Sequence, residues 1–162
     1  MGSEPAIASE TDIAMMRLAL EEAKAAGAIG EVPIGAVVYR TATGEVLAKA
    51  HNLRERDRNP AAHAEFLAIV EACRAVGDWR LNDCSLAVTL EPCPMCAGLI
   101  VNARVGRAVF GTTDPKAGAV RTLYNLGDDP RLNHRAQIVG GVLEEECGTM
   151  LKQFFAALRG KG

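Results

Sequence analysis

Residues 86–102, LAVTLEPCPMCAGLIVN, join a short apolar run to a second apolar segment through two closely spaced prolines. The run from Leu86 to Leu90 is typical of a buried strand, and Pro92 and Pro94 mark a junction after it. Met95 to Asn102 continues as a helix, because proline is tolerated at the first helical position, where its missing N–H would have no partner. A strand that passes directly into a helix is typical of a sheet covered by helices.

Segments on both sides of this stretch extend the same alternation. The expected elements are a helix over residues 11–26, strands over Ile34–Tyr39 and Glu45–Ala50, a helix over Ala61–Val76, a strand over Arg107–Gly111, a short helix near Thr122–Leu126, a strand over Gln137–Val142 and a helix over Leu143–Leu158. The first two strands are joined by a tight turn and must be antiparallel, whereas strands separated by helices can run parallel. The expected fold is α/β, a three-layer α/β/α sandwich around a mixed five-stranded sheet.

Length and composition predict one globular domain over residues 1–162, of which residues 1–10 are expected to be flexible. Hydrophobic residues make up 49% of the chain and charged residues 23%, a balance that excludes disordered and fibrous classes. No apolar run approaches the ~20 residues of a membrane span. The first ten residues carry Glu4 and Glu10 but no basic residue, unlike a secretory signal. We therefore expect a soluble cytoplasmic protein.

The net charge is −2, but the charges are unevenly distributed along the chain. Residues 1–31 are acidic, whereas residues 101–125 and 149–162 are basic. Such basic segments are compatible with a local phosphate-binding face. The alternative is that these charges are scattered over a solvated surface.

The chain has five cysteines, an odd number that argues against a closed disulfide framework. Cys73, Cys84 and Cys147 are isolated, and we expect them to pack as small apolar groups. Trp79 is expected in the core or at an interface.

The remaining two cysteines, Cys93 and Cys96, form a C-x-x-C pair that follows the sequence His63-Ala64-Glu65. One imidazole and two thiolates are three zinc ligands, and a catalytic zinc keeps its fourth position for water. Each half of the set begins a predicted helix, whose N-terminus favours thiolates and bound hydroxide. We therefore predict one catalytic Zn²⁺ per chain, bound by His63, Cys93 and Cys96.

Glu65 has two possible roles beside such an ion. It could be a fourth ligand, or it could take a proton from the attacking water and pass it to a substrate nitrogen. The arrangement H-x-E followed by P-C-x-x-C is the signature of zinc nucleobase deaminases and favours the second role.

Two other interpretations of the C-x-x-C pair remain open. A redox pair is expected after the first strand of a thioredoxin-like unit, whereas this pair follows the third predicted strand. A structural zinc site needs a fourth cysteine or histidine, for which His51 and His134 are available.

From about Asp12 to Arg159 the chain resembles the bacterial tRNA-specific adenosine deaminases of the cytidine deaminase-like superfamily. The resemblance rests on blocks at residues 31–37 (EVPIGAV), 51–52 (HN), 62–65 (AHAE), 89–98 (TLEPCPMCAG), 109–111 (VFG), 114–119 (DPKAGA), 133–135 (NHR) and 154–155 (FF). The chain departs from the family pattern at Arg121-Thr122, where Gly-Ser is usual, at the bulky Phe66, and in its short C-terminus after Lys161.

This resemblance implies the roles of the site residues. Zinc is bound by His63, Cys93 and Cys96, and Glu65 shuttles protons. The substrate contacts implied are Asn52 on the flipped base, Val32 and Leu90 as pocket walls, and Asp114, Lys116, Asn133, His134 and Phe154 near the anticodon loop. Similar proteins are homodimers, and the tRNA contacts both subunits.

Three of these residues also have purely structural explanations. Asn52 could cap a turn, and His134 could be a hydrogen-bonded structural residue. Phe154 and Phe155 are adjacent on a helix and cannot both face the core, so at least one is expected in it.

The function expected from residues and resemblance is hydrolytic deamination of adenosine to inosine at the wobble position of tRNA. The target base must be turned out of its stack, which is easiest in a loop such as the anticodon loop. The alternatives are a deaminase of free bases or nucleosides, such as guanine or cytosine, and a non-catalytic, zinc-stabilised RNA-binding module.

Overall fold

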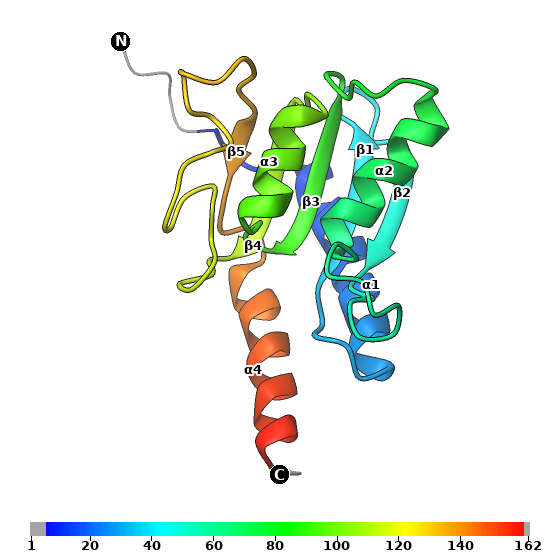
Figure 1. Cartoon of the computed structure of the whole chain (residues 1–162), viewed down its shortest axis with the longest axis vertical. Helices are drawn as coiled ribbons and strands as arrows, with labels where there is room; N and C mark the ends of the chain where they lie inside the picture. The colour runs from blue at the N-terminus through cyan, green and yellow to red at the C-terminus, as the bar shows by residue number, and fades with distance from the viewer. Residues whose placement is uncertain (1–5, 161–162) are drawn as a thin grey trace.

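Five strands form one sheet in the order β2-β1-β3-β4-β5 in the computed structural model, which describes residues 6–160 (Figure 1). The elements in chain order are α1 (Glu10–Ala28), β1 (Gly35–Arg40), β2 (Val46–His51), α2 (Ala64–Val76), β3 (Cys84–Leu90), α3 (Pro94–Asn102), β4 (Arg107–Thr112), β5 (Gln137–Val139) and α4 (Glu144–Gly160).

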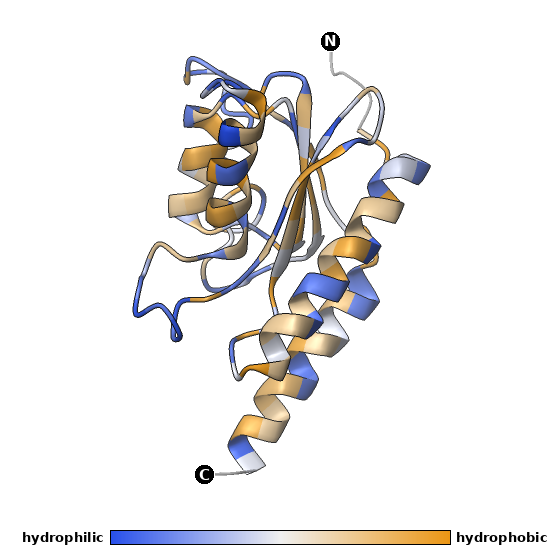
Figure 2. Ribbon diagram, turned by 90° about the vertical axis from the view of Figure 1, so that its right-hand side faces the viewer, coloured by the Kyte–Doolittle hydropathy of each residue, from blue (hydrophilic) through white to orange (hydrophobic). Residues whose placement is uncertain are grey.

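The sheet is mixed, as predicted. Strand β1 is antiparallel to both of its neighbours, β2 and β3, whereas β3, β4 and β5 run parallel. Helices α2 and α3 cover one face and α1 and α4 cover the other, so that the sheet lies edge-on between two helical layers in Figure 2. The predicted α/β/α sandwich is confirmed.

Alternate side chains of the central strands supply two cores, one on each face of the sheet. Leu86 and Val88 of β3 belong to the core under α2 and α3. Ala87, between them, and Val37 of β1 belong to the core under α1 and α4. Because both faces are buried, β3 is buried from Cys84 to Thr89, and its centre, Leu86 to Val88, is continuously apolar rather than alternating with polar residues.

The ends of the helices follow their local sequence. Ser9 and Asp12 form a reciprocal capping box at the start of α1. Pro94 occupies the first turn of α3, and Gly77 ends α2 in the left-handed conformation at φ +77°.

Two predicted elements are wrong. Residues 122–126 are irregular instead of a short helix, because the N–H groups of Leu123 and Tyr124 donate to the Gly118 carbonyl and that of Leu126 to the Ala119 carbonyl, five to seven positions back instead of four. Strand β5 ends at Val139 rather than Val142, because Gly141 adopts φ +78° and Gly140 lies against the ring of Phe110.

The three isolated cysteines are at least partly buried, as predicted. Cys84 and Cys147 are buried and Cys73 is half-buried. Trp79 is 53% exposed, however, and lies outside the core, with the Arg80 guanidinium 4.6 Å from its ring centre.

Two further expectations concern the flexibility of residues 1–10 and membrane-spanning helices. Of the segment expected to be flexible, residues 1–5 lie outside the described residues, and the Ile7 carbonyl accepts a hydrogen bond from Arg107. None of the helices within residues 6–160 is long and apolar enough to cross a membrane.

A buried carboxylate, Asp12, connects α1 to the sheet. It is 2% exposed, accepts a 2.6 Å hydrogen bond from the Tyr39 hydroxyl and forms an ion pair with Arg107. Burial alone would raise the pKa of Asp12, but hydrogen bonds from Arg107, Tyr39 and the Ser9 backbone outweigh it, and the pKa is lowered. The interaction joins α1, β1 and β4 at the edge of the sheet where β4 begins.

We expect Asp12→Asn to lower the free energy of unfolding by roughly 3 kcal/mol at pH 7, because Arg107 loses its buried counter-charge. A carboxyl whose folded-state pKa is lowered stabilises the fold above its unfolded pKa of about 3.9 and loses that contribution as pH falls through the folded value. The difference between wild type and variant should therefore shrink below about pH 4 in urea titrations. The exposed variant Glu71→Gln is the control, and a pH-independent difference would contradict this assignment.

Candidate active site

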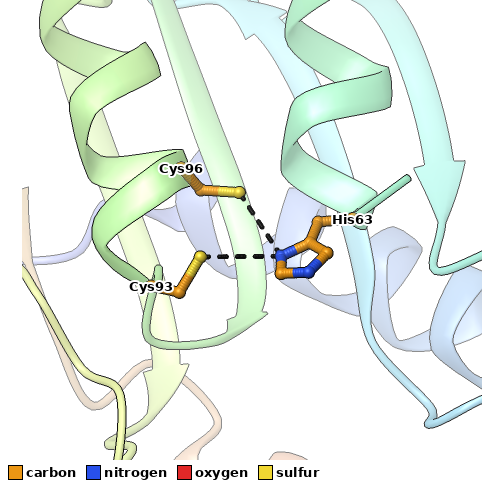
Figure 3. Close-up of side chains that lie close together, drawn as sticks. All are labelled: His63, Cys93 and Cys96. Carbon is orange, nitrogen blue, oxygen red and sulfur yellow. Dashed lines mark hydrogen bonds between the residues drawn. The ribbon is translucent and has the colours of Figure 1, made fainter. Parts of the chain in front are cut away.

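Three possible metal ligands converge where α2 and α3 begin (Figure 3). His63 is the N-cap residue of α2, Cys93 is the N-cap residue of α3, and Cys96 lies one turn further along α3. The Nδ1 atom of His63 lies 3.6 Å from the Sγ atom of each cysteine. All three ligand atoms lie within 4.8 Å of one another.

The spacing of these atoms fits a tetrahedral zinc ion. Bonds of about 2.3 Å to sulfur and about 2.0–2.1 Å to nitrogen, at the tetrahedral angle, place N and S about 3.6 Å apart. The observed distances of 3.6 Å agree with this value. Imidazole and thiolate are also the donors that zinc prefers.

The local charges favour a cation at this point. A hydrogen bond from Cys96, together with one from His63, lowers the pKa of the Cys93 thiol to about 4. These two bonds outweigh burial, which would raise it. The cluster therefore contains a thiolate at neutral pH. Neither His63 nor Cys93 uses its side chain to cap its helix, so both remain available as ligands.

The two histidines considered as fourth ligands bond elsewhere. The Nδ1 atom of His51 lies 2.7 Å from the Glu22 carboxylate. The Nε2 atom of His134 lies 2.7 Å from the Val105 carbonyl oxygen, as expected for a structural histidine. Among the described residues the cluster consists of His63, Cys93 and Cys96 alone, which favours a site with one position open to water over a structural zinc site.

Glu65 lies in the first turn of α2, in the wall of the cavity next to the cluster, and is 4% exposed. Burial raises the pKa of its carboxyl to about 7. A carboxyl that titrates near neutral pH can both accept and release a proton during a reaction.

The cluster opens into a cavity of about 280 Å³. Asn52, Val32 and Leu90 line this cavity, as the resemblance implies. The amide of Asn52 donates to the Val32 carbonyl at 3.3 Å, and its oxygen accepts from the Arg54 N–H at 3.1 Å. Asn52 therefore stabilises the loop after β2, in agreement with a role in capping a turn, and it also borders the cavity.

The residues assigned to RNA contact are only partly together. Asp114 lines the cavity. Lys116 lies in an adjoining groove, together with Lys152 and Arg159. Asn133 lines a separate groove along α3, and His134 bonds to the Val105 carbonyl.

Phe155 rather than Phe154 lines the cavity and the adjoining groove. The two rings meet edge to face, with centres 5.4 Å apart. Phe155 is exposed and Phe154 is half-buried, so the expectation that at least one of them lies in the core is wrong. Helical periodicity alone does not say which of two adjacent positions faces a cavity, because that depends on how α4 is docked.

Sequence reasoning missed two buried glutamates beside the site. Glu31 accepts hydrogen bonds from the N–H groups of Glu55 and Arg56, in the loop after β2. Glu91 binds the loop after β4 in the same way. The signal was present for Glu91, because a glutamate directly after a buried strand is buried at a cost unless it is hydrogen-bonded.

The departure from the family pattern at Arg121-Thr122 has a local explanation. The Arg121 guanidinium donates to the Ile138 carbonyl at 3.2 Å and lies 3.4 Å from the Asp128 carboxylate. Thr122 donates its hydroxyl to Glu91. Neither residue lines the cavity.

A family profile agrees with this fold and cluster. The cytidine and deoxycytidylate deaminase zinc-binding region matches residues 9–112, which contain all three ligands and Glu65. The class of the protein is therefore a zinc-dependent deaminase domain, in which His63, Cys93 and Cys96 are positioned to bind a metal ion.

Individual relatives narrow the class. The tRNA-specific adenosine deaminase of Bacillus subtilis is 57% identical over 146 residues, which cover 90% of this chain and 89% of the relative. A structure solved in a study of A-to-I editing by tRNA:A34 deaminases at the wobble position of tRNA has a TM-score of 0.80 and 41% identity, covering 85% of this chain and 99% of that one. The chain belongs to the family of tRNA-specific adenosine deaminases.

A guanine deaminase from Nitrosomonas europaea shares the fold, with a TM-score of 0.76 at 24% identity over 95% of this chain and 89% of that one.

We expect the purified protein to contain about one zinc ion per chain by elemental mass spectrometry, and Cys93→Ser to contain almost none. Serine does not ionise at neutral pH and is a poor zinc ligand. Cys73→Ser is the matched control, because Cys73 is half-buried and lies outside the cluster. Full zinc content in Cys93→Ser would contradict the assigned ligand set.

Proposed function

We propose that this protein converts adenosine to inosine at the first anticodon position of tRNA. The observation that carries the proposal is the three-ligand cluster at a small cavity with the buried carboxyl of Glu65 in its wall. The 57% identity to a tRNA-specific adenosine deaminase supports this choice of substrate.

The cluster accounts for the nucleophile. Held by His63, Cys93 and Cys96, a zinc ion would supply a water molecule whose pKa is lowered enough for attack near neutral pH. The net reaction consumes one water, breaks the bond between C6 and the exocyclic nitrogen, and releases ammonia.

Glu65 moves the protons of this reaction. It takes a proton from the attacking water as the new C–O bond forms at C6, and gives that proton to the ring nitrogen N1. It then carries the second proton of the water to the amino group, which leaves as ammonia. Its pKa of about 7 suits a group that must accept and release protons in one cycle.

The cavity orients the base. The side chain of Asn52 has both a donor and an acceptor, so it can bind the edge of a purine, and Val32 and Leu90 are apolar walls for its faces. An adenine within a stacked helix cannot reach such a cavity, whereas an anticodon base can be turned out at low cost.

The surface around the cavity would bind the rest of the anticodon stem-loop. Lys116, Lys152 and Arg159 lie along the adjoining groove, where they can meet phosphates. We assign Asp114 and Lys116 to nucleotides beside the target, together with the aromatic pair Phe154 and Phe155.

We also propose that the protein acts as a homodimer in the cytoplasm, where its tRNA substrate is found. Met95 and Leu132 are exposed apolar residues of the groove along α3, a surface that a second copy could cover. Asn133 lies in the same groove. In a dimer it would lie near the subunit boundary, where a tRNA that contacts both subunits can reach Asn133 and His134.

Substrate choice can be measured directly. Purified protein is incubated with an anticodon stem-loop, guanine, cytosine or cytidine, and ammonia release is followed. We expect turnover of the stem-loop alone, with the first anticodon adenosine read as guanosine on sequencing. A stem-loop carrying guanosine at that position is the control. Turnover of free guanine or cytosine without turnover of the stem-loop would contradict the proposal, and no turnover at all would favour an RNA-binding module.

Replacement of Glu65 by glutamine should lower kcat by about 10²- to 10⁴-fold, because the amide cannot accept the proton of the water. Zinc content should be unchanged, since Glu65 is outside the ligand cluster. The matched control is Glu71→Gln, an exposed glutamate on the same helix, which should retain full activity. If Glu65→Gln retains its activity, Glu65 is not the proton carrier.

A further inference from the structure

The carboxylate of Glu91 is the centre of a hydrogen-bonded loop. Glu91 is the first residue after β3 and is 2% exposed. Its Oε1 atom accepts from the Asp114 N–H at 3.1 Å and from the Thr122 hydroxyl. Its Oε2 atom accepts from the N–H groups of Val120, Arg121 and Thr122 at 3.3, 2.9 and 2.9 Å.

These bonds occupy the whole carboxylate. Two carboxylate oxygens offer about four lone-pair sites, and five donors already point at them. Glu91 borders the cavity, but no acceptor capacity remains for a substrate group. Any effect of Glu91 on the reaction must therefore pass through the loop that it holds.

The loop over residues 114–122 is built around this carboxylate. A Cβ atom on Gly118 would lie 2.4 Å from the carboxyl carbon of Glu91, so a side chain there would displace the carboxylate. The Ala119 N–H also donates to the carbonyl oxygen of Pro92, the residue before the ligand Cys93, at 2.9 Å. The loop is thus bonded to the chain segment that leads into the metal cluster.

The same loop is a wall of the substrate site. Asp114 and Ala117 line the cavity together with His63 and Cys93, and Lys116 lines the adjoining basic groove. The Asp114 carboxylate accepts from the N–H groups of Lys116 and Ala117, at 3.0 and 3.1 Å, and so holds the turn at its tip.

We propose that Glu91 is a positioning residue for substrate binding, which fixes the 114–122 loop so that Asp114 and Lys116 face the RNA. The choice of RNA as the ligand rests on the function proposed above. Glu91 sets substrate affinity through this loop, whereas the metal cluster and Glu65 set the rate of the chemical step.

Four variants separate this role from general destabilisation. Glu91→Gln places two N–H donors against the loop donors, and Thr122→Val removes one hydroxyl at nearly constant size. Thr122→Ser keeps the hydroxyl and is the conservative rescue. Asp12→Asn is the matched control, because it disrupts a buried carboxylate at the opposite edge of the sheet without touching the loop.

KM and kcat of each variant are measured with an anticodon stem-loop as substrate, and the zinc content is measured by elemental analysis. Limited trypsin digestion then reports the rate of cleavage after Lys116 and Arg121. We expect Glu91→Gln to raise KM about tenfold, as loss of hydrogen bonds to a charged group implies, with kcat and zinc nearly unchanged and faster cleavage at both sites. Thr122→Val should show a smaller change in the same direction, and Thr122→Ser should restore wild-type values.

Three results would overturn the proposal. They are an unchanged KM and cleavage rate in both Glu91→Gln and Thr122→Val, loss of zinc in Thr122→Val, and an equal rise of KM in Asp12→Asn. If Glu91→Gln fails to fold, the two Thr122 variants decide. If the wild type does not act on the stem-loop, the proposed function fails, and trypsin cleavage, which needs no substrate, still tests whether Glu91 holds the loop.

Discussion

The site depends on one constraint, which is that β2 and β3 run in the same direction. Both strands are antiparallel to β1, which lies between them. The helix that follows each strand must therefore begin at the same edge of the sheet and run back over the same face. This geometry brings the N-termini of α2 and α3 together, and with them His63 and Cys93 (Figure 3). The carboxyl ends of parallel strands are the usual position of ligand sites in α/β folds.

Buried carboxylates at the two ends of the strands have different hydrogen-bond partners. At the edge where β4 begins, Asp12 and Arg107 form a buried ion pair that connects helix and strands. At the other edge, the buried carboxylates Glu31 and Glu91 bind backbone N–H groups of two loops instead of side-chain cations. The loop held by Glu91 buries Ala119 and Val120 in the core, and the carboxylate satisfies backbone N–H groups of the loop that no strand or helix pairs.

The sequence predicted the order of helices and strands along the chain well and the irregular segments poorly. The apolar run of β3, Pro94 and Gly77 are local signals, and each corresponds to an element or a helix end in the structure. The short helix expected at residues 122–126 was wrong because the N–H groups of Leu123 and Leu126 bond back to Gly118 and Ala119, in a loop that the distant Glu91 holds. Likewise the end of β5 depends on how Gly140 meets Phe110, a contact between two strands.

By itself the sequence determined the donor types of the metal site, the helices that carry them and the layered fold, because ligand chemistry and hydrophobic period are properties of short segments. Only the tertiary structure decided that Phe155 rather than Phe154 faces the cavity, that His51 and His134 bond elsewhere, and that Glu91 holds a distant loop. Those outcomes depend on contacts between residues far apart in the chain, and the residues on either side of each position carry no information about such partners.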